Sequence, residues 1–182
     1  MTFPDQPTLT GPTLHLRPLR LDDHAALAAA ASDPAIWTGH PARDRHKPEV
    51  FAPYFDMLLD AGGTLVITER GSDAVIGCSR YYPAPEGPGE IGIGFTFLTT
   101  AHWGGTTNRD LKTLMLDHAF RHVDRVWFHI DPSNIRSQKA TAKLGAKYIE
   151  TRERPLGTSP GMWMCYALEK SVWKAAQASG SG

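Results

Sequence analysis

The sequence predicts a single α/β domain, α+β in character, built on a mixed β-sheet. Three observations favour this class. Strand-like and helix-like segments follow one another in the order β-α-α-β-β-β-α-β-α-β-β. The chain has 182 residues, of which 41% are hydrophobic and 21% charged, as in one globular domain. No apolar run approaches the length that spans a bilayer. We expect the domain to cover residues 10–172 and a flexible tail to follow over 173–182.

Seven strands are expected from alternation of apolar and polar residues and from turn signals. Residues 13–19 alternate around Leu14 and Leu16, which is typical of a half-buried strand. The run Gly-Ser-Asp over 71–73 is a hairpin signal between two strands. The expected strands are residues 13–19, 64–69, 74–82, 90–98, 125–130, 146–152 and 161–168.

Four helices are expected between these strands. Asp22 and Asp23 precede an Ala-rich stretch, where acidic residues favour a helix start. The third helix carries a broad apolar face, so we expect it to pack on the sheet. Gly145 ends the fourth helix. The expected helices are residues 24–31, 48–61, 108–122 and 134–144.

Composition excludes several function classes. Lys+Arg and Asp+Glu both number 19, and a neutral chain is a poor candidate for non-specific nucleic-acid binding. Cys78 and Cys165 have no CxxC spacing, so no disulfide framework or zinc knuckle is expected. The first ten residues lack the features of a signal peptide. We therefore expect a cytoplasmic protein with no nucleic-acid or membrane partner.

The strand over residues 90–98 has one bulky and one nearly bare face. Ile91, Ile93, Phe95 and Phe97 are expected on the bulky face, and the bare face begins at Glu90. Glycines weaken a strand unless something approaches the backbone closely. The bare face predicts either a groove for a ligand, with Glu90 at its end, or tight packing or a bulge.

The segment 102–108, His-Trp-Gly-Gly-Thr-Thr-Asn, leads into the third helix. Free amides at a helix start attract phosphate, and two glycines let the backbone come close to a bulky anion. The order strand, Gly-rich turn, helix therefore predicts an anion site. The turn lacks the P-loop Lys-Ser/Thr pair, which argues against nucleoside triphosphates.

Asn134, Ser137 and Thr141 form one polar stripe on the fourth helix, which lines a groove or is solvated surface. His118 and His122 have helical metal-ligand spacing, but no third ligand is spaced to join them. The sequence has no GxSxG elbow. We expect no metal and no serine hydrolase.

These segments resemble a known family. The turn Trp-Gly-Gly-Thr-Thr-Asn over 103–108 resembles the acetyl-CoA pyrophosphate loop of GNAT acetyltransferases, in the ribosomal-protein-alanine N-acetyltransferase-like branch. Residues 134–146 resemble that branch's Asn-x-x-Ser…Lys-x-Gly signature. Residues 13–19 and 75–77 resemble its opening strand and third-strand entry. The similarity spans residues 10–170.

The resemblance implies the GNAT fold, in which the fourth and fifth strands (90–98 and 125–130) splay apart at the centre. It also implies acetyl-CoA as cosubstrate. The pantetheine arm would pair with backbone at the end of the fourth strand, and the pyrophosphate would rest on amides of the turn. The cofactor-binding residues so expected are Phe97, Leu98, Thr99, Trp103, Gly104, Gly105, Thr106, Thr107, Asn108, Asn134 and Ser137.

The implied reaction is transfer of an acetyl group to a primary amine, of a protein N-terminus or a small molecule, by direct attack in a ternary complex. The amine must first lose a proton, and we expect Glu90 to accept it, with His129 and Asp131 as alternatives. Many GNAT enzymes place a Tyr where this chain has Thr141, as acid for the thiolate. Ser137 is the expected substitute.

The acceptor site is expected in the loop 35–47, the second helix and the loop 152–160. Its expected aromatic and charged wall is Trp37, His40, Arg43, Tyr54, Tyr81 and Tyr82, and ordinary packing and solvated charge are the alternative explanation for them. The branch makes a homodimer plausible. Two other functions stay open: a different enzyme that uses the same turn, and a catalytically reduced CoA-binding or sensory module.

Overall fold

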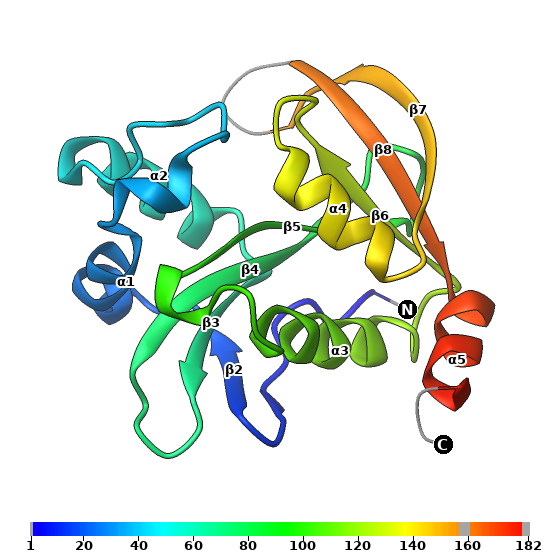
Figure 1. Cartoon of the computed structure of the whole chain (residues 1–182), viewed down its shortest axis with the longest axis horizontal. Helices are drawn as coiled ribbons and strands as arrows, with labels where there is room; N and C mark the ends of the chain where they lie inside the picture. Colours follow the sequence, from blue (N-terminus) through cyan, green and yellow to red (C-terminus); the bar gives the residue numbers. More distant parts are fainter. Residues whose placement is uncertain (1, 157–160, 180–182) are drawn as a thin grey trace.

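The computed structural model describes residues 2–156 and 161–179. An eight-stranded sheet in the order β1-β2-β3-β4-β5-β6-β8-β7 forms its centre, with helices on both faces (Figure 1). Neighbouring strands are antiparallel except for the parallel pair β5 and β6. The strands are β1 Leu9–Thr10, β2 Leu14–Pro18, β3 Thr64–Glu69, β4 Val75–Pro83, β5 Ile91–Leu98, β6 Arg125–Ile130, β7 Lys147–Arg154 and β8 Gly161–Glu169.

Five α-helices accompany the sheet within the described ranges. They are α1 His24–Ala31, α2 Pro48–Asp60, α3 Thr107–Ala119, α4 Ile135–Lys143 and α5 Lys170–Ser179. The predicted mixed α/β class is confirmed, with one more strand and one more helix than expected: the two-residue β1 and the helix α5. No helix in this part of the chain has both the length and the apolar character to cross a membrane.

The expected flexible tail is corrected by α5. This helix continues directly from β8, and the Trp173 indole is buried, with its Nε1 donating to Asp117 Oδ1 of α3 at 2.7 Å. A buried tryptophan holds residues 170–179 against the domain. Residues 180–182 lie outside the described residues, and the limits 10–172 stay a prediction.

Of the three apolar clusters among the described residues, the two larger ones lie between the sheet and its helices. One joins α3 and Trp173 to sheet residues such as Leu16, Ile67 and Ile93. The other joins α1 and α2 to the sheet at Cys78 and Phe97. The third helix therefore packs on the sheet as its broad apolar face predicted.

A β-bulge interrupts β5 and overturns the expected single bulky face. Cys78 pairs with Phe97 while Arg80 pairs with Gly94, so β5 has one residue more than β4 over this stretch. Phe95 has φ of +52°, a left-handed conformation that is rare for a bulky residue. Beyond the bulge the faces exchange: Ile93 lies in the α3 core and Phe97 in the α1/α2 core.

The parallel pair β5 and β6 is joined only at one end. Ile91 pairs with Val126 and Gly92 with Trp127, and no later pair joins these two described strands. The strands therefore diverge toward their carboxyl ends, as the splayed central pair was expected to do. This divergence opens the sheet beside the start of α3 and alongside α4.

Candidate active site

A large cleft, with a cavity volume of about 1100 Å³, occupies the gap between β5 and β6. The carboxyl half of β5 from Ile93 and the end of β6 from Phe128 form its two sides. The turn before α3 and the inner side of α4 also line it, as do residues of the segment 36–45. The cleft therefore joins the predicted cofactor loop to the predicted acceptor wall.

The cleft is strongly basic although the whole chain is neutral. Its one lining carboxylate in the described part of the chain is Asp131. Cationic side chains come from three parts of the chain, the loop before α2, α3 and α4, and face this single acid, so the cleft favours a polyanionic ligand. The lining cations are Arg45, Arg109, Lys112, Arg136, Lys139 and Lys143.

The turn before α3 has the open backbone that an anion site needs. Gly104 has φ of +75°, a conformation that favours glycine. A Cβ built on Gly105 would meet no atom within 4 Å. The Asp110 amide is the first to bond back along the helix, to the Thr106 carbonyl at 2.8 Å, so the preceding amides have no intrahelical acceptor. These features fit a pyrophosphate group.

The predicted cofactor residues of this region divide into two groups. The lining of the cleft includes Phe97, Leu98, Trp103, Gly104, Gly105, Thr106 and Asn108. Thr99 and Thr107 are not part of it. The Thr99 amide already donates to the Ile76 carbonyl at 2.8 Å, and its hydroxyl bonds His102 Nδ1 at 2.6 Å. Thr99 is therefore unable to pair with a pantetheine arm through its amide, contrary to the expectation.

Trp103 connects the end of β5 to α4 at the opening of the cleft. Its indole Nε1 donates to the Leu98 carbonyl at 3.0 Å, and the Arg136 guanidinium lies 4.0 Å from its ring centroid. Arg136 also donates to the Ile36 carbonyl at 3.0 Å. Trp103 thus occupies a β5 carbonyl that a pantetheine arm was expected to use.

The polar stripe of α4 faces the cleft. Asn134 caps the helix, its Oδ1 accepting from the Ser137 amide at 3.1 Å, which leaves the Asn134 Nδ2 hydrogens for a ligand. The Ser137 hydroxyl has no hydrogen-bond partner among the described residues. Thr141 is buried in the cleft lining. A free hydroxyl and a free amide group therefore stand along this side.

Four of the six predicted wall residues line the cleft, whereas Arg43 and Tyr81 do not. Trp37, His40 and Tyr54 line the cleft, and the Arg45 guanidinium lies 3.8 Å from the Tyr54 ring centroid. Burial lowers the pKa of His40 to about 4, so this imidazole is neutral near pH 7. Its Nδ1 accepts from the Ala42 amide at 3.0 Å.

Tyr81 is not part of this wall. It is fully buried on the opposite face of the sheet, and its hydroxyl donates to the Met115 carbonyl of α3 at 2.7 Å. Its neighbour Tyr82 lines the cleft, because successive strand residues point to opposite faces.

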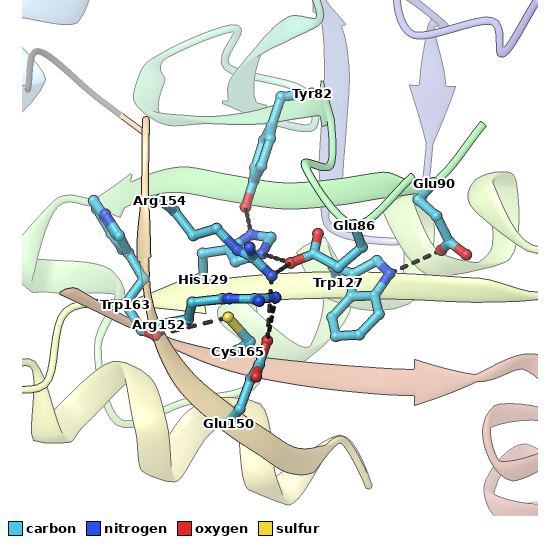
Figure 2. Close-up of polar contacts among 10 residues, drawn as sticks. All are labelled: Tyr82, Glu86, Glu90, Trp127, His129, Glu150, Arg152, Arg154, Trp163 and Cys165. Atoms are coloured by element: carbon cyan, nitrogen blue, oxygen red, sulfur yellow. Dashed lines mark hydrogen bonds and ion pairs between the residues drawn. The ribbon is translucent and has the colours of Figure 1, made fainter. Parts of the chain in front are cut away.

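Glu90 also lies away from the cleft. It precedes β5, and its Oε2 accepts a hydrogen bond from Trp127 Nε1 at 2.8 Å (Figure 2). The bare face on which it was expected is occupied by Tyr82: a Cβ on Gly92 would meet that ring at 2.4 Å, and one on Gly94 at 3.1 Å. Glu90 therefore does not reach an amine in the cleft, whereas the alternative base His129 lines it.

Lys112 is a cleft residue that sequence reasoning missed. Its ammonium donates to Thr96 Oγ1 at 2.8 Å and to Ser79 Oγ at 3.4 Å, and burial lowers its pKa to about 7. A lysine one residue from Leu111 on a mainly apolar helix face was the available signal. The sequence gave no comparable signal for Arg45, which lies in a loop, or for Arg136, which lies in a polar helix.

Three of the metal-ligating residue types gather beside the cleft. Ligand atoms of Glu86, His129 and Cys165 lie within 4.8 Å of one another. Arg154 already donates to Glu86 Oε1 at 2.9 Å, and its positive charge opposes a second cation there. The absence of a metal cofactor stays a prediction.

The sequence profile of the acetyltransferase (GNAT) domain family matches residues 13–147. The chain belongs to the GNAT acetyltransferase family. Its fold and its family support acetyl transfer as the chemistry of this GNAT domain. A comparison with curated proteins found no match.

Solved structures share the fold of this GNAT acetyltransferase. A GCN5-related N-acetyltransferase from Brucella melitensis has a TM-score of 0.80 at 17% identity, over 97% of this chain and 86% of that one. A GNAT-family acetyltransferase from Bacillus anthracis has a TM-score of 0.72 at 15% identity, over 91% and 99%. Mycobacterium smegmatis RimJ in complex with CoA-disulfide has a TM-score of 0.70 at 19% identity, over 98% of each chain.

Proposed function

We propose that this GNAT domain is an acetyl-CoA-dependent N-acetyltransferase that acts on a primary amine by direct attack in a ternary complex. One observation carries the proposal: a cleft lined by six cations and one acid opens where β5 and β6 part and ends at the free amides of α3. A phosphate-rich, extended cosubstrate fits this charge and shape. The acceptor would be a protein N-terminus, as in the ribosomal-protein branch, or a small amine.

The residues present fit CoA at specific points. The open space at Gly105 and the amides of the turn would hold the pyrophosphate. Asn134 Nδ2 would donate to the arm from the α4 side. The arm would reach the Leu98 carbonyl only after the Trp103 indole leaves it, so Trp103 competes with the cosubstrate for that acceptor.

Acetyl-CoA would supply an activated thioester carbonyl. The unpaired Ser137 hydroxyl in the cleft lining can donate to a departing thiolate, and Thr141 lies beside it as the residue that replaces the family's common Tyr. Positioning of the two substrates in one cleft would supply much of the rate gain. The acceptor amine would lie among Trp37, Tyr54 and Tyr82.

Orphaned polar atoms gather at the acceptor end. In the described part of the chain, Glu86 Oε2, Arg154 Nε and Trp163 Nε1 are buried side-chain atoms without a hydrogen-bond partner. Such atoms are rare in folded proteins and mark places where a ligand or water binds. Trp163 lines the cleft, so it would donate to a polar group of the acceptor.

The cosubstrate is tested first, by thermal shift with acetyl-CoA at up to millimolar concentration. A stabilised protein is expected, because a ligand that binds only the folded state raises the melting temperature. Absence of any shift would contradict acetyl-CoA binding.

Catalysis is tested next, by thiol release with a panel of amines: an alanine-initiated peptide, a serine-initiated peptide, an alkylamine and an aminoglycoside. Release above the hydrolysis background with at least one amine is expected. A protein that binds acetyl-CoA but acetylates none of them would instead be the catalytically reduced module.

A further inference from the structure

A buried chain of polar side chains leads out of the cleft at the acceptor end. Tyr82 Oη lies 2.8 Å from His129 Nδ1, and His129 Nε2 lies 2.9 Å from Glu86 Oε1 (Figure 2). Tyr82 comes from β4, His129 from β6 and Glu86 from the loop between β4 and β5. Tyr82 and His129 line the cleft, whereas Glu86 lies behind them.

The local fold is built to hold this contact. Gly92 and Gly94 leave room for the Tyr82 ring, since a Cβ on either residue would press on it. The bulge at Phe95 follows directly on the same strand, and the Phe95 ring packs edge-on to Tyr82 with centroids 5.6 Å apart. The phenol is thus fixed with its hydroxyl against the imidazole. The glycine face of β5 thus holds the Tyr82 phenol in place.

The hydrogen bonds fix the direction of proton flow. An ionised Glu86 carboxylate only accepts, so the hydrogen of His129 lies on Nε2 and the Nδ1 atom is an acceptor. The Tyr82 hydroxyl then donates to Nδ1, and its oxygen can accept from a donor in the cleft. An acceptor ammonium is such a donor.

We propose that Tyr82, His129 and Glu86 form the relay that deprotonates the acceptor amine, which rests on the proposed N-acetyltransferase function. An ammonium proton passes to Tyr82 Oη while the Tyr82 hydroxyl proton passes to His129 Nδ1. The amine keeps the electron pair and becomes the nucleophile, and the imidazole becomes imidazolium. His129 afterwards returns the proton through Tyr82 to water that enters the cleft, which restores the starting tautomer.

The surroundings of His129 suit a base of this kind. Its side chain is 1% exposed and that of Glu86 10%, so their attraction is little screened. The unpaired Glu86 Oε2 leaves negative charge available to the imidazolium that forms. This is the role that a carboxylate plays behind the histidine of a hydrolase triad.

Charged and titratable groups face His129 from four elements. They are Tyr82 of β4, Glu86 of the loop, Arg154 of β7 and the Cys165 thiol of β8. Burial lowers the pKa of His129, Arg154 lowers it further and Glu86 raises it. The imidazole is therefore neutral and able to accept a proton near pH 7, and it loses that ability as the pH falls through its pKa.

The test compares Tyr82→Phe, His129→Gln and Glu86→Gln with wild type, using the best amine of the acceptor panel. Tyr148→Phe is the matched control, since it removes an exposed phenol oxygen that is not part of the cleft lining. We measure kcat/KM from about pH 5, to cover the acid limb that the lowered pKa of His129 sets, to one unit above the pKa of the amine. Acetyl-CoA binding by thermal shift verifies that each variant is folded and loaded.

Near pH 7 we expect Tyr82→Phe and His129→Gln to lose about 100-fold in kcat/KM, a typical value for one acid–base group. We expect the loss to shrink above the pKa of the amine, because a neutral amine needs no base. Glu86→Gln should shift the acid limb of the profile to lower pH, since it destabilises the imidazolium.

Three results would overturn the relay. Variants with a deficit that is the same at every pH have lost structure rather than a proton path. If the variants are as active as Tyr148→Phe, the Tyr82, His129 and Glu86 relay is not used. Wild-type activity that disappears with a chelator and returns with Zn²⁺ makes Glu86, His129 and Cys165 a metal site. A wild type that acetylates no amine fails at the earlier step, the proposed function.

Discussion

At the scale of single residues, Lys112 is a buried cation of the cleft lining. Among the described residues its ammonium has no carboxylate partner and donates to the hydroxyls of Thr96 and Ser79. Burial disfavours the charged form and lowers its pKa from 10.5 to about 7. The charged form therefore costs folding stability at and below neutral pH.

We expect Lys112→Met to raise the free energy of unfolding by a few kcal/mol at pH 6–7. Below about pH 7 the lysine is charged in both states, so its burial cost is largest there. Above the unfolded pKa it is neutral in both states, and the gain should vanish as the pH rises toward about 10.5. Urea denaturation at several pH values measures the gain. Lys139→Met, an exposed cleft lysine, is the control, and an equal gain there would contradict the explanation.

Glu90 gives a second prediction at this scale. We expect Glu90→Gln to keep kcat within about twofold of wild type across pH 6–9, because a glutamine oxygen still accepts from Trp127 Nε1 and neither group reaches the cleft. The measurement is the pH–rate profile with the best acceptor. A loss above tenfold together with a missing acid limb would restore Glu90 as the base.

The sequence could indicate residue types at the site but not always which neighbour faces it. Tyr81 and Tyr82 are adjacent and equally aromatic, and only the register of β4 decides that Tyr82 faces the cleft and Tyr81 faces α3. Glu90 failed for a related reason, because nothing in the pattern showed that the bare face would be filled by a ring from the next strand.

At the scale of elements, the turn before α3 is a glycine pair with two different tasks. Gly104 needs glycine for its positive φ, whereas Gly105 leaves open space in the cleft. Gly104 therefore determines the path of the backbone, and Gly105 leaves room for a ligand. Substitutions at the two positions should affect folding stability and acetyl-CoA binding separately.

We expect Gly105→Ala to leave the melting temperature unchanged and to weaken acetyl-CoA binding about tenfold or more. The added methyl meets no protein atom, but it stands where the phosphates would approach the amides. Calorimetric titration gives the Kd. Gly71→Ala is the inverse control: its φ of +97° predicts lost stability with an unchanged Kd. Unchanged affinity in Gly105→Ala would place the pyrophosphate elsewhere.

Elements were predictable where periodicity was strong, as for α3 and the hairpin of β3 and β4. The bulge in β5 was not, since the sequence alternates without a break and the extra residue is visible only in the pairing with β4. The predicted faces of β5 after Phe95 were therefore wrong, although the predicted limits of the strand were nearly right. Bulges depend on tertiary packing rather than on local preference.

At the scale of the whole molecule, α5 closes the domain at the end of β8. The Trp173 side chain joins the larger core and bonds Asp117 of α3. A short amphipathic segment after the last strand resembled a tail in sequence, because Trp173 is its one buried side chain among the described residues. The pattern gave little sign that this side chain would reach α3.

We expect Trp173→Ala to lower the free energy of unfolding by about 3 kcal/mol, because it removes a buried aromatic ring and leaves a cavity. Urea denaturation measures the change, and the acetyl-CoA Kd should stay the same since α5 does not line the cleft. The adjacent Lys174→Ala, on the exposed side, should cost almost nothing. If both variants matched wild type, residues 173–179 would not stabilise the fold.

The parting of β5 and β6 has a consequence for what this molecule attracts. Strand edges normally lie at the rim of a sheet, where another protein chain can add to them. Here the facing edges of β5 and β6 lie at the centre of the sheet, where a neighbouring protein chain cannot add to them as it would at a rim. A slim extended molecule with amide groups can enter between them. The amides on these edges should exchange with deuterium quickly in the free protein and slowly once such a molecule threads between them. The width of the gap between β5 and β6 therefore limits which molecules can enter, before any side chain contacts them.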